Sequence, residues 1–370
     1  MKLIFTSYSS SPEFDQPREW LKRIEGYTGI LESLSKDNTV IGIERINYEG
    51  EYIQQGVQYF FIRQKRKTVH FPWRIHRLIK KLSPDIVFIN GFIFPLQIIQ
   101  LRLKLGNRVK IIVLNRSEKP FEGLKGYLQR LADTCVDAHL FSSSEFGKEW
   151  VEKRNIHDRE KIHEVLHGSS IFGARSKDAK RSGSSPTGSP VFLWVGRLDA
   201  NKDPLTVVKG FIHFLAVQPL AKLCLIYQSE ELLPEINDLI KENKNVLQAI
   251  NLVGKVPHQQ LQAWYDKADF IISGSHYEGG GISVCEAMSC GCIPIVTDII
   301  SFRKMTGPGK CGLLYEAGNE KALSDALRLT MQMDIKKEKE KTIKQFREEL
   351  SFDAIADKIN KVIHSNFDLV

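Results

Sequence analysis

Long hydrophobic runs are absent from this sequence. A helix that spans a membrane needs roughly 18–20 apolar residues in a row, whereas the longest apolar runs, such as residues 86–90 and 110–114, have only the length of buried strands. The N-terminus carries a single apolar run at residues 3–5, and a signal-peptide core needs roughly 7–15 such residues. We therefore expect neither a membrane span nor an export signal, and the predicted location is cytoplasmic.

Cysteine is scarce, and its spacing does not suit a metal site. The six cysteines are at positions 135, 224, 285, 290, 292 and 311. Only Cys290 and Cys292 are close in sequence, and the one residue between them is shorter than the usual zinc-site spacing of roughly two to four. We therefore expect no metal ion, and we expect the cysteines to be buried small hydrophobic side chains in a reducing compartment.

The glycine-rich loop of dinucleotide-binding proteins is also missing. Neither of the apolar runs at residues 3–6 and 191–195 is followed by G-x-G-x-x-G and a later acidic residue. A dinucleotide requires that loop for its pyrophosphate and that acid for its ribose. The absence argues against a dehydrogenase.

The composition is otherwise that of a globular protein, with 42% hydrophobic and 26% charged residues, which excludes the collagen-like and disordered classes. The length of 370 residues exceeds what one hydrophobic core usually organises, so it predicts two domains. The formal net charge is +8. Residues 1–175 hold 28 Lys and Arg against 20 Asp and Glu, whereas residues 176–370 hold 24 of each. The whole positive excess lies in the first half.

Short runs rich in Ile and Val alternate with amphipathic stretches in the first half, one of which predicts a helix over residues 17–36. The predicted strands are residues 3–6, 40–46, 86–90, 111–115 and 138–142. This alternation is typical of βαβ units. It predicts the α/β class, with a parallel sheet that is buried on both faces.

Residues 176–190 break the alternation, because Ser, Gly, Pro and Lys dominate them, and this composition predicts a flexible linker. The alternation then resumes, with helices predicted over residues 203–217 and 258–267 and a last helix over residues 336–367. The predicted strands after the linker are residues 191–198, 223–228, 251–256, 269–275, 292–297 and 312–316. The expected domains are a lobe over residues 1–175, the linker 176–190, a lobe over 191–350, and a closing helix over 351–370.

Residues 191–204 carry the first candidate site. A buried strand ends at Gly196, and a helix begins after Asp203. Arg197 and Lys202 therefore lie at the carboxyl end of a parallel strand and beside a helix N-terminus, where α/β sheets bind ligands and anions are favoured. The planar fork of Arg and the point charge of Lys suit a diphosphate without a metal. Taken alone, however, a solvated turn with two exposed cations explains these residues better.

Residues 271–296 carry the second candidate site. A strand runs into three glycines at 279–281 and a helix begins near Ile282, so unpaired N–H groups are presented where a phosphate can bind. Glu278 precedes the glycines, and Glu286 lies one turn into the helix. Glu286 stands among apolar and small residues, where an exposed acid is unusual. We interpret the two carboxylates as hydrogen-bond acceptors, one for a sugar and the other for a ribose diol.

Together, the two segments resemble family 4 of the retaining glycosyltransferases. The sequence V-G-R-L-D-A-N-K-D-P is followed about eighty residues later by E-G-G-G-I-S-V-C-E-A-M-S-C-G-C-I-P-I-V, and both motifs recur in this order in the family. The resemblance covers the whole predicted second lobe. It implies the GT-B fold, in which two Rossmann-like doubly wound lobes face each other across a cleft and a C-terminal helix crosses back to the first lobe.

The resemblance also implies roles for individual residues. Arg197 and Lys202 hold the donor diphosphate, Glu278 faces the donor sugar, Glu286 contacts the nucleotide ribose, and the nucleobase lies against Gly254. The predicted catalytic residues are Arg197, Lys202 and Glu278. The residues predicted to bind the donor are Gly196, Gly254, Gly279, Gly280, Gly281, Ile282 and Glu286.

The sequence departs from the family in two places. Family members often read E-G-F-G where this chain has Gly280 in place of the aromatic residue, and the first lobe lacks the expected Gly-Gly loop after its first strand. It offers Ser9 and Ser10 instead, which either contact the acceptor or form an ordinary Ser-rich turn. Residues 116–119, which include Arg116, likewise either bind the acceptor or a phosphate, or form a surface loop.

Residues 61–81 concentrate the positive charge. They include eight Lys and Arg and no acid, with Phe71, Trp73, Ile75 and other apolar residues between them. An amphipathic helix near residues 73–82 either rests on an anionic membrane or packs its apolar stripe on the sheet with a solvated basic face. The aromatic residues lie on a helical stripe and form no stacking platform, so nucleic acid is not an expected partner.

We interpret the chain as a retaining glycosyltransferase that moves a sugar from a nucleoside-diphosphate sugar to an acceptor hydroxyl, in the synthesis of cell-surface polysaccharide or glycolipid. Its expected partners are the nucleotide sugar and a sugar or lipid-linked acceptor, joined by an anionic membrane surface if residues 61–81 contact lipid at the inner face of the membrane; no cofactor or metal is expected. One alternative is a GT-B nucleotide-sugar epimerase, which would use the same donor groups. Another is a non-catalytic lipid-binding protein, which would leave the four charged motif residues unexplained.

Overall fold

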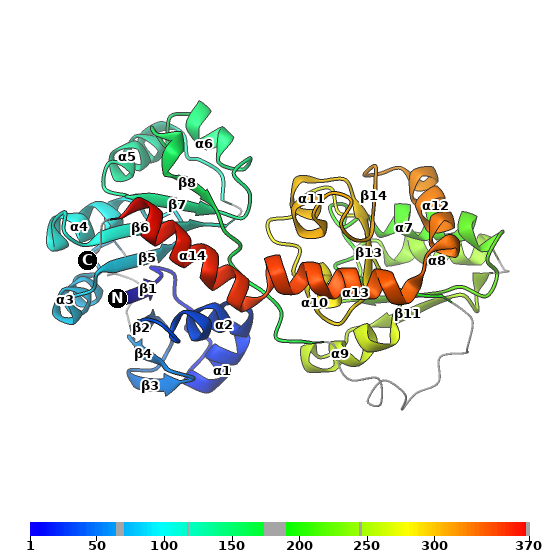
Figure 1. The fold of residues 1–370 in the computed structure, drawn as a ribbon, viewed down its shortest axis with the longest axis horizontal. Coiled ribbons are helices and arrows are strands. Elements are labelled where there is room, and N and C mark those ends of the chain that lie inside the picture. Colours follow the sequence, from blue (N-terminus) through cyan, green and yellow to red (C-terminus); the bar gives the residue numbers. More distant parts are fainter. Residues whose placement is uncertain (64–69, 117, 174–189, 244–245, 368–370) are drawn as a thin grey trace. The chain divides into compact units, whose positions relative to one another are not determined.

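The chain forms two compact units, each with its own sheet (Figure 1). A computed structural model describes residues 1–63, 70–116, 118–173, 190–243 and 246–367. Unit 1 comprises Met1–Ser169 and Phe352–Val370, and unit 2 comprises Ser170–Ser351. The predicted linker, residues 176–190, lies outside the described residues except for Pro190.

Within the described residues, unit 1 has an eight-stranded sheet in the order β3-β4-β2-β1-β5-β6-β7-β8, which is parallel except for the pair β3 and β4. Its strands are β1 (Lys2–Thr6), β2 (Thr39–Glu44), β3 (Gly50–Gln54), β4 (Val57–Phe61), β5 (Ile86–Asn90), β6 (Lys110–Asn115), β7 (Ala138–Phe141) and β8 (Ile162–Glu164). Its helices are α1 (Pro17–Arg23), α2 (Glu25–Leu34), α3 (Trp73–Leu82), α4 (Pro95–Leu105), α5 (Gly123–Asp133), α6 (Lys148–Glu152) and α14 (Phe352–Asn366), with a 3₁₀ turn at Arg159–Lys161.

Alternate residues of these strands feed two hydrophobic cores, one on each face of the sheet. Leu3 and Phe5 of β1 belong to one core together with apolar residues of α1, α2 and α14. Ile4 belongs to the other core, which includes residues of α3, α4 and α5. Because side chains alternate along a strand, burial on both faces makes the strands read as continuous apolar runs. The prediction of a parallel sheet buried on both faces is confirmed.

The helix predicted over residues 17–36 is divided in the structure into α1 and α2. The break is at Ile24, whose φ of −109° and ψ of 21° are not helical. Beyond the break, a Cβ atom at Gly29 would lie 2.5 Å from the Phe352 ring of α14. The carbonyl of Gly26 accepts a hydrogen bond of 2.9 Å from the Ser169 N–H. Two glycines therefore let α2 approach its neighbours closely. The sequence pattern, which predicts one uninterrupted helix, does not reveal these contacts.

The sequence interpretation missed the hairpin of β3 and β4. Its turn residues Gln55 and Gly56 have φ values of 48° and 81°, as the common two-residue hairpin turns require. The residues of β3 are exposed or half-buried throughout, so this edge strand lacks the apolar run that marked the others. Its place at the sheet edge explains why the sequence alone did not indicate it.

Unit 2 has, within the described residues, a six-stranded parallel sheet in the order β11-β10-β9-β12-β13-β14. Its strands are β9 (Val191–Gly196), β10 (Lys222–Tyr227), β11 (Ile250–Gly254), β12 (Phe270–Ser273), β13 (Ile293–Thr297) and β14 (Leu313–Tyr315). Its helices are α7 (Pro204–Leu215), α8 (Leu233–Glu242), α9 (His258–Lys267), α10 (Ile282–Ser289), α11 (Ile300–Thr306), α12 (Glu320–Leu329) and α13 (Ile335–Gln345), with a 3₁₀ turn at Thr330–Gln332. The six strands predicted after the linker are all found.

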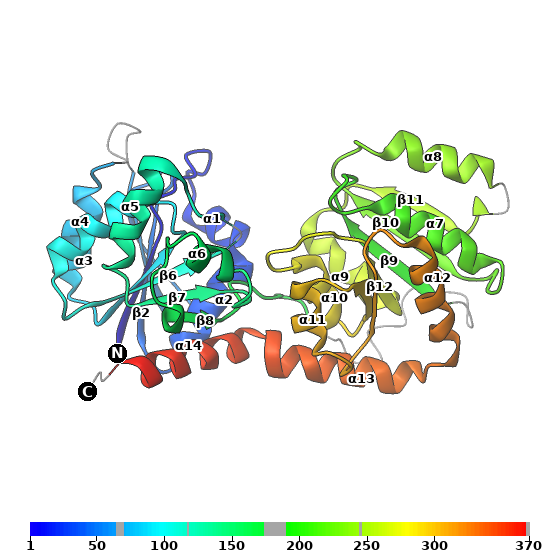
Figure 2. The same cartoon turned by 90° about the horizontal axis from the view of Figure 1, so that it is seen from above.

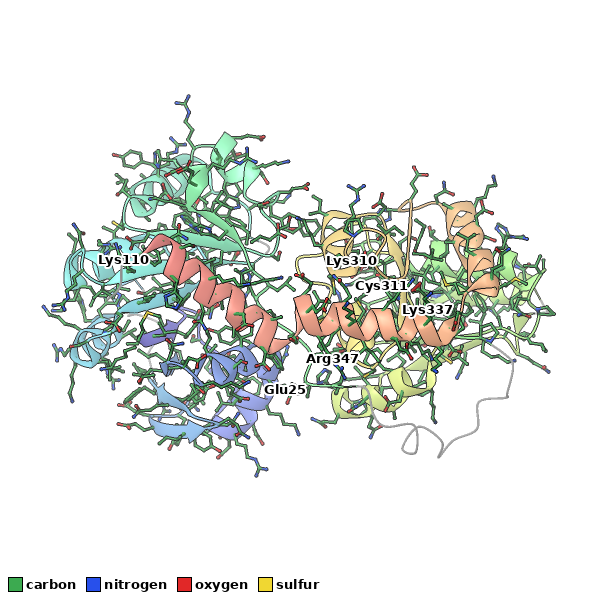
Figure 3. The ribbon with its side chains drawn as sticks, viewed as in Figure 1. Glu25, Lys110, Lys310, Cys311, Lys337 and Arg347 are labelled. Atoms are coloured by element: carbon green, nitrogen blue, oxygen red, sulfur yellow. The ribbon has the colours of Figure 1, made fainter. Side chains whose placement is uncertain are left out.

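The last predicted helix, residues 336–367, is three segments. Helix α13 continues into a π-helical turn, Phe346–Leu350, and ends at Ser351 before α14 begins. Helix α14 buries Ile355, Ile359 and Ile363 in the core of unit 1, and Figure 2 shows it lying along this unit. At its far end, the Lys110 ammonium lies 5.3 Å from the centre of the Phe367 ring (Figure 3). The closing helix thus packs on the first lobe, as predicted.

The predicted lobe boundary at residue 175 is too late, because the chain joins unit 2 at Ser170. The Ser170 and Ser289 hydroxyl groups are hydrogen-bonded at 2.8 Å. The Phe172 ring packs against the rings of His258 and Tyr265, with centroids 5.0 and 6.0 Å apart. These contacts attach residues 170–173 to unit 2 before the predicted linker begins.

Four of the six cysteines are buried. Burial raises the pKa of the Cys311 thiol to about 12, so this thiol stays protonated near neutral pH; Figure 3 shows it beside α13. Across the described ranges of the chain, no helix is both long enough and apolar enough to cross a bilayer.

Candidate functional site

The two sequence motifs of unit 2 meet at one edge of its sheet. Strand β9 lies beside β10 on one side and β12 on the other. From β9, the chain therefore adds β10 and β11 toward one edge of the sheet and then β12, β13 and β14 toward the other edge. The loops that follow β9 and β12 leave from the carboxyl ends of these strands. Open α/β sheets bind their ligands at such a switch point.

The loop after β9 is organised by Asp199. Its carboxylate accepts a hydrogen bond of 2.9 Å from the Lys202 N–H and lies 3.1 Å from the Arg197 guanidinium. Asp203 has a left-handed φ of 42° and caps α7 by accepting the Thr206 N–H at 3.1 Å. The Arg197 side chain is 63% exposed. The loop therefore presents one exposed guanidinium, while Lys202 points toward the neighbouring loop.

Lys202 pairs with Glu278 from the loop after β12. The side chains of Lys202 and Glu278 are only 20% and 13% exposed, and Glu278 also accepts a hydrogen bond of 2.8 Å from the Ser275 hydroxyl. Backbone contacts hold the loops together, since the His276 N–H donates to the Asn201 carbonyl at 2.9 Å. The structure brings together these two predicted residues, although 76 positions separate them in sequence.

The three glycines lead directly into α10. Gly279 is half-buried and Gly280 is exposed, while Gly281 precedes the helix with a φ of 52°. A Cβ atom at Gly281 would lie 2.8 Å from the Phe302 ring. Both the left-handed backbone conformation and the lack of space for a side chain therefore favour glycine at this position. The first N–H groups of a helix, here those beginning at Ile282, have no partner within the helix. This end of α10 is suited to a phosphate.

Glu286 lies one turn into α10 and is 6% exposed. Its carboxylate accepts a hydrogen bond of 3.0 Å from the Tyr265 hydroxyl and is bonded to His258 Nε2 at 2.6 Å. Burial and the Glu286 carboxylate raise the pKa of Tyr265 well above its usual range, so the tyrosine is a donor at neutral pH. A carboxylate has about four acceptor positions, so Glu286 keeps capacity for a ligand diol.

The two remaining predicted glycines also end strands of this sheet. At Gly196, a Cβ atom would lie 3.0 Å from the Trp194 ring and 3.6 Å from Lys202. Gly254 ends β11 with a φ of 80°, and a Cβ atom there would meet nothing within 4 Å. Gly254 therefore borders open space at the end of β11.

Polar side chains also gather at the carboxyl edge of the unit 1 sheet. Glu44 at the end of β2 accepts a hydrogen bond of 3.0 Å from the Trp20 indole, and burial raises the pKa of Glu44 to about 7. Asn90 at the end of β5 donates to the Tyr27 hydroxyl at 3.1 Å. The exposed Arg116 guanidinium lies 5.7 Å from the centre of the Tyr27 ring. This edge combines aromatic rings, a carboxyl group and a cation.

Sequence reasoning had singled out Arg116 alone among these five residues. Glu44, Trp20 and Tyr27 come from separate elements, and nothing in their local sequence indicates that they meet. In unit 2, the partners of Glu286 were missed in the same way. His258 offered a signal, because it begins a helix soon after the strand end at Gly254. Among the residues that the structure describes, no three His, Cys, Asp or Glu side chains form a group that could hold a metal ion.

Comparisons with known proteins support the interpretation of unit 2. Residues 175–349 match the family model described as glycosyl transferases group 1. The GDP-mannose:cellobiosyl-diphosphopolyprenol alpha-mannosyltransferase of Xanthomonas oryzae pv. oryzae is 27% identical over 138 residues, which are 37% of this chain and 36% of that protein. The D-inositol 3-phosphate glycosyltransferase of Streptosporangium roseum is 25% identical over 155 residues, covering 40% of this chain and 36% of that protein. The chain thus spans about a third of the length of these curated relatives.

Solved structures extend the likeness to the whole chain. A glycosyltransferase from Rickettsia africae has a TM-score of 0.71 at 16% identity, covering 100% of this chain and 99% of that chain. A sucrose-phosphate synthase from Thermosynechococcus elongatus has a TM-score of 0.69 at 16% identity, covering 99% of both chains. At these identities the likeness concerns the fold alone, and that fold is GT-B, with two Rossmann-like units in one chain.

Proposed function

We propose that this chain, whose residues 175–349 match the family model of glycosyl transferases group 1, transfers a sugar from a nucleoside-diphosphate sugar to an acceptor hydroxyl with retention at the anomeric carbon. The observation that carries the proposal is the pairing of Lys202 with Glu278 beside the glycine-rich entry to α10. Two sequence-distant motifs thereby join a cation, a carboxylate and a helix N-terminus at the switch point of the sheet.

In this proposal, the donor diphosphate is bound by Arg197, Lys202 and the N–H groups at the start of α10. The reaction breaks the bond from the anomeric carbon to the diphosphate oxygen, so negative charge develops on the leaving group. Positioned cations and N–H groups stabilise such charge by several kcal/mol. Because two side chains supply this charge, the proposal requires no metal ion. Glu278 faces the donor sugar, and Glu286 accepts hydrogen bonds from the ribose.

The acceptor oxygen forms the new bond to the anomeric carbon, and its proton passes to the leaving phosphate oxygen. Front-face attack of this kind needs no protein nucleophile and retains the anomeric configuration. Product analysis by NMR decides the stereochemistry, since an inverted anomeric linkage would exclude this route.

We further propose that the acceptor is a phosphorylated glycan or lipid-linked sugar, bound by unit 1. The names of the two curated relatives described above refer to compounds that carry phosphate, a cellobiosyl-diphosphopolyprenol and an inositol 3-phosphate. The positive excess of residues 1–175 agrees with an anionic acceptor. The expected product class is therefore a cell-surface polysaccharide or glycolipid precursor, made at the cytoplasmic face of the membrane.

The basic helix α3 supports a contact with that membrane. Ile75 and Ile79 are fully buried in the core of unit 1, so the apolar stripe packs as in an ordinary sheet-covering helix. Phe71 and Trp73 nevertheless remain 52% and 57% exposed, with their rings stacked 6.1 Å apart, beside the exposed cations of the same helix. Exposed aromatic rings with cations are typical of membrane-interface contacts. Residues 64–69 of the basic segment lie outside the described residues.

Co-sedimentation with vesicles tests the membrane contact. Vesicles of phosphatidylglycerol should retain the protein at low salt and release it as salt increases, and Trp73→Ser should reduce the bound fraction. The matched control is Leu329→Ser, which removes a 52% exposed apolar side chain from unit 2. Equal loss in both variants, or binding that salt does not affect, would contradict the role of α3.

A panel of nucleotide sugars tests the activity itself. Each sugar is incubated with the protein alone and then with sugar phosphates or lipid-linked sugars as acceptors. The proposal expects binding of one nucleotide class and transfer only when the acceptor is present. Isomerisation of the donor without an acceptor would instead favour the epimerase, and no turnover of any donor would refute the proposed function.

A further inference from the structure

A pocket of about 530 Å³ opens among the loops of unit 1. Its polar lining includes the side chains of Ser10, Arg45, Asn47, Glu49, Arg63 and Arg74. Because β1, β2 and β4 are parallel neighbours, the residues that follow them lie at one edge of the sheet. The pocket is thus built by the chain segments leaving three adjacent strands, together with the first turn of α3.

The Arg45 guanidinium is the most unusual group of this pocket. Arg45 is 3% exposed and its guanidinium donates to the Tyr8 carbonyl, but its buried Nε has no hydrogen-bond partner among the described residues. No ion pair joins Arg45 to a carboxylate of the described residues, and the sequence between Arg63 and Phe71 contains no acid. A buried cation without a countercharge costs several kcal/mol. An anion in the pocket would supply the missing charge and acceptors.

Two further arginines line the pocket from its exposed side. The Arg74 guanidinium pairs with the Glu49 carboxylate and donates to the Arg63 carbonyl at 3.2 Å. Arg63 forms no ion pair with another of the described residues. The lining therefore sets three guanidinium groups against one carboxylate. The planar fork of arginine is matched to phosphate oxygens.

The loops around Arg45 are held by backbone bonds. The Ser11 N–H donates to the Arg45 carbonyl at 2.9 Å, and the Asn47 N–H donates to the Phe14 carbonyl at 2.7 Å. These bonds fix the Ser-rich segment beside the residues that follow β2. The Ser10 hydroxyl and the Asn47 amide then add neutral hydrogen-bonding groups to the three cations.

We propose that this pocket is a phosphate-binding site of unit 1, in which Arg45, Arg63 and Arg74 hold a phosphate or diphosphate group. The assignment of that group to the acceptor rests on the proposed function; the site itself does not. The group comes either from a free phosphorylated sugar or from a phosphate at a membrane surface. The chemistry is the same in both cases, so the experiment separates the two sources.

Calorimetric titration with inorganic pyrophosphate tests the site, using the full chain at fixed ionic strength. The Lys202→Ala variant serves as the background, because the donor site of unit 2 is also expected to bind pyrophosphate. Binding should persist in this background and weaken at least about tenfold when Arg63→Ala and Arg74→Ala are added, since each removes charge-assisted hydrogen bonds. Both side chains are exposed, so these changes spare the fold. Arg45→Met should have the larger effect, with circular dichroism to verify folding.

Arg77→Ala is the matched control, because Arg77 lies on the same helix, is exposed and does not line the pocket. Its pyrophosphate affinity should equal that of the background. Loss of all binding in Lys202→Ala, or equal loss in the control and the pocket variants, would overturn the site.

A second arm uses phosphatidylglycerol vesicles with and without pyrophosphate. If pyrophosphate releases the protein from the vesicles, and this release is absent in the pocket variants, the site binds a phosphate at the membrane surface. If the pocket binds pyrophosphate but the pocket variants bind vesicles as well as the background does, the phosphate comes from a free phosphorylated sugar. If pyrophosphate binds as predicted but no donor sugar is ever transferred, the phosphate site stands and only the proposed function fails.

Discussion

Lys202 offers the sharpest test of the proposed donor site, because its two expected roles can be separated. It pairs with Glu278 between side chains that are only 20% and 13% exposed, and it is proposed to neutralise the leaving diphosphate. The change to Met keeps most of the side-chain length and removes the charge. It therefore removes a stabilising group from the transition state and also leaves the Glu278 carboxylate without its cation.

The expected loss of activity follows from the first role. Removing one preorganised group from a developing oxyanion costs about 2.7–4 kcal/mol, or roughly 10²–10³ in kcat. The expected loss of stability follows from the second. Removing one partner of a fully buried pair costs about 3–5 kcal/mol; here partial exposure and the remaining Ser275 hydrogen bond reduce this to about 1–2 kcal/mol.

The double variant Lys202→Met with Glu278→Gln separates the two effects. Removing the uncompensated carboxylate should restore much of the thermal stability, measured by calorimetry, while sugar transfer stays at or below the level of the single variant. Lys209→Met is the matched control, since Lys209 is an exposed lysine of α7 that lies 3.8 Å from Glu320. The reasoning is refuted if activity recovers together with stability, because Lys202 would then serve the fold alone.

Three other predictions concern single positions. Glu286→Gln should weaken nucleotide binding about tenfold in calorimetry while leaving the melting temperature within a few degrees, because the amide oxygen still accepts from Tyr265; unchanged affinity would remove Glu286 from the ribose site. Burial holds the pKa of Glu44 at about 7 in the folded state, above its unfolded value of about 4.3, so the folded state binds the extra proton. The contribution of this group to the free energy of unfolding should fall as pH rises from about 4.5 to 7. In denaturant titrations, the free energy of unfolding of Glu44→Gln should therefore rise relative to that of the wild type by up to about 3 kcal/mol between pH 5 and 8. A difference between the two proteins that does not change with pH would contradict the elevated pKa. Gly281→Ala should lower stability by about 1–3 kcal/mol and abolish donor binding, because its φ is 52° and the added Cβ atom would lie 2.8 Å from the Phe302 ring; normal binding would show that this turn has no role.

Much of the fold could be predicted because its signals are local. Strands buried on both faces read as apolar runs, so β1, β5, β9 and β12 were evident without any knowledge of their neighbours. The hairpin of β3 and β4 could not be predicted in this way, since β3 lies at the sheet edge and has no fully buried face. The apolar pattern runs through Ile24, so it did not indicate the division of α1 from α2 there. The close approach of Phe352 to Gly29 joins residues more than 300 positions apart, which local signals do not report.

The sequence by itself determined where the charged motif residues of unit 2 lie, because residue type, spacing and strand ends place Arg197, Lys202 and the glycines at the carboxyl edge of a parallel sheet. Only the tertiary structure decided their partners. Lys202 meets Glu278 because the loops after β9 and β12 are neighbours in space, and Glu286 meets Tyr265 because α10 lies beside α9. The burial of Arg45 in unit 1, without a carboxylate partner among the described residues, is likewise visible only in the tertiary structure. Burial and countercharge are properties of the folded surroundings, which local sequence does not encode.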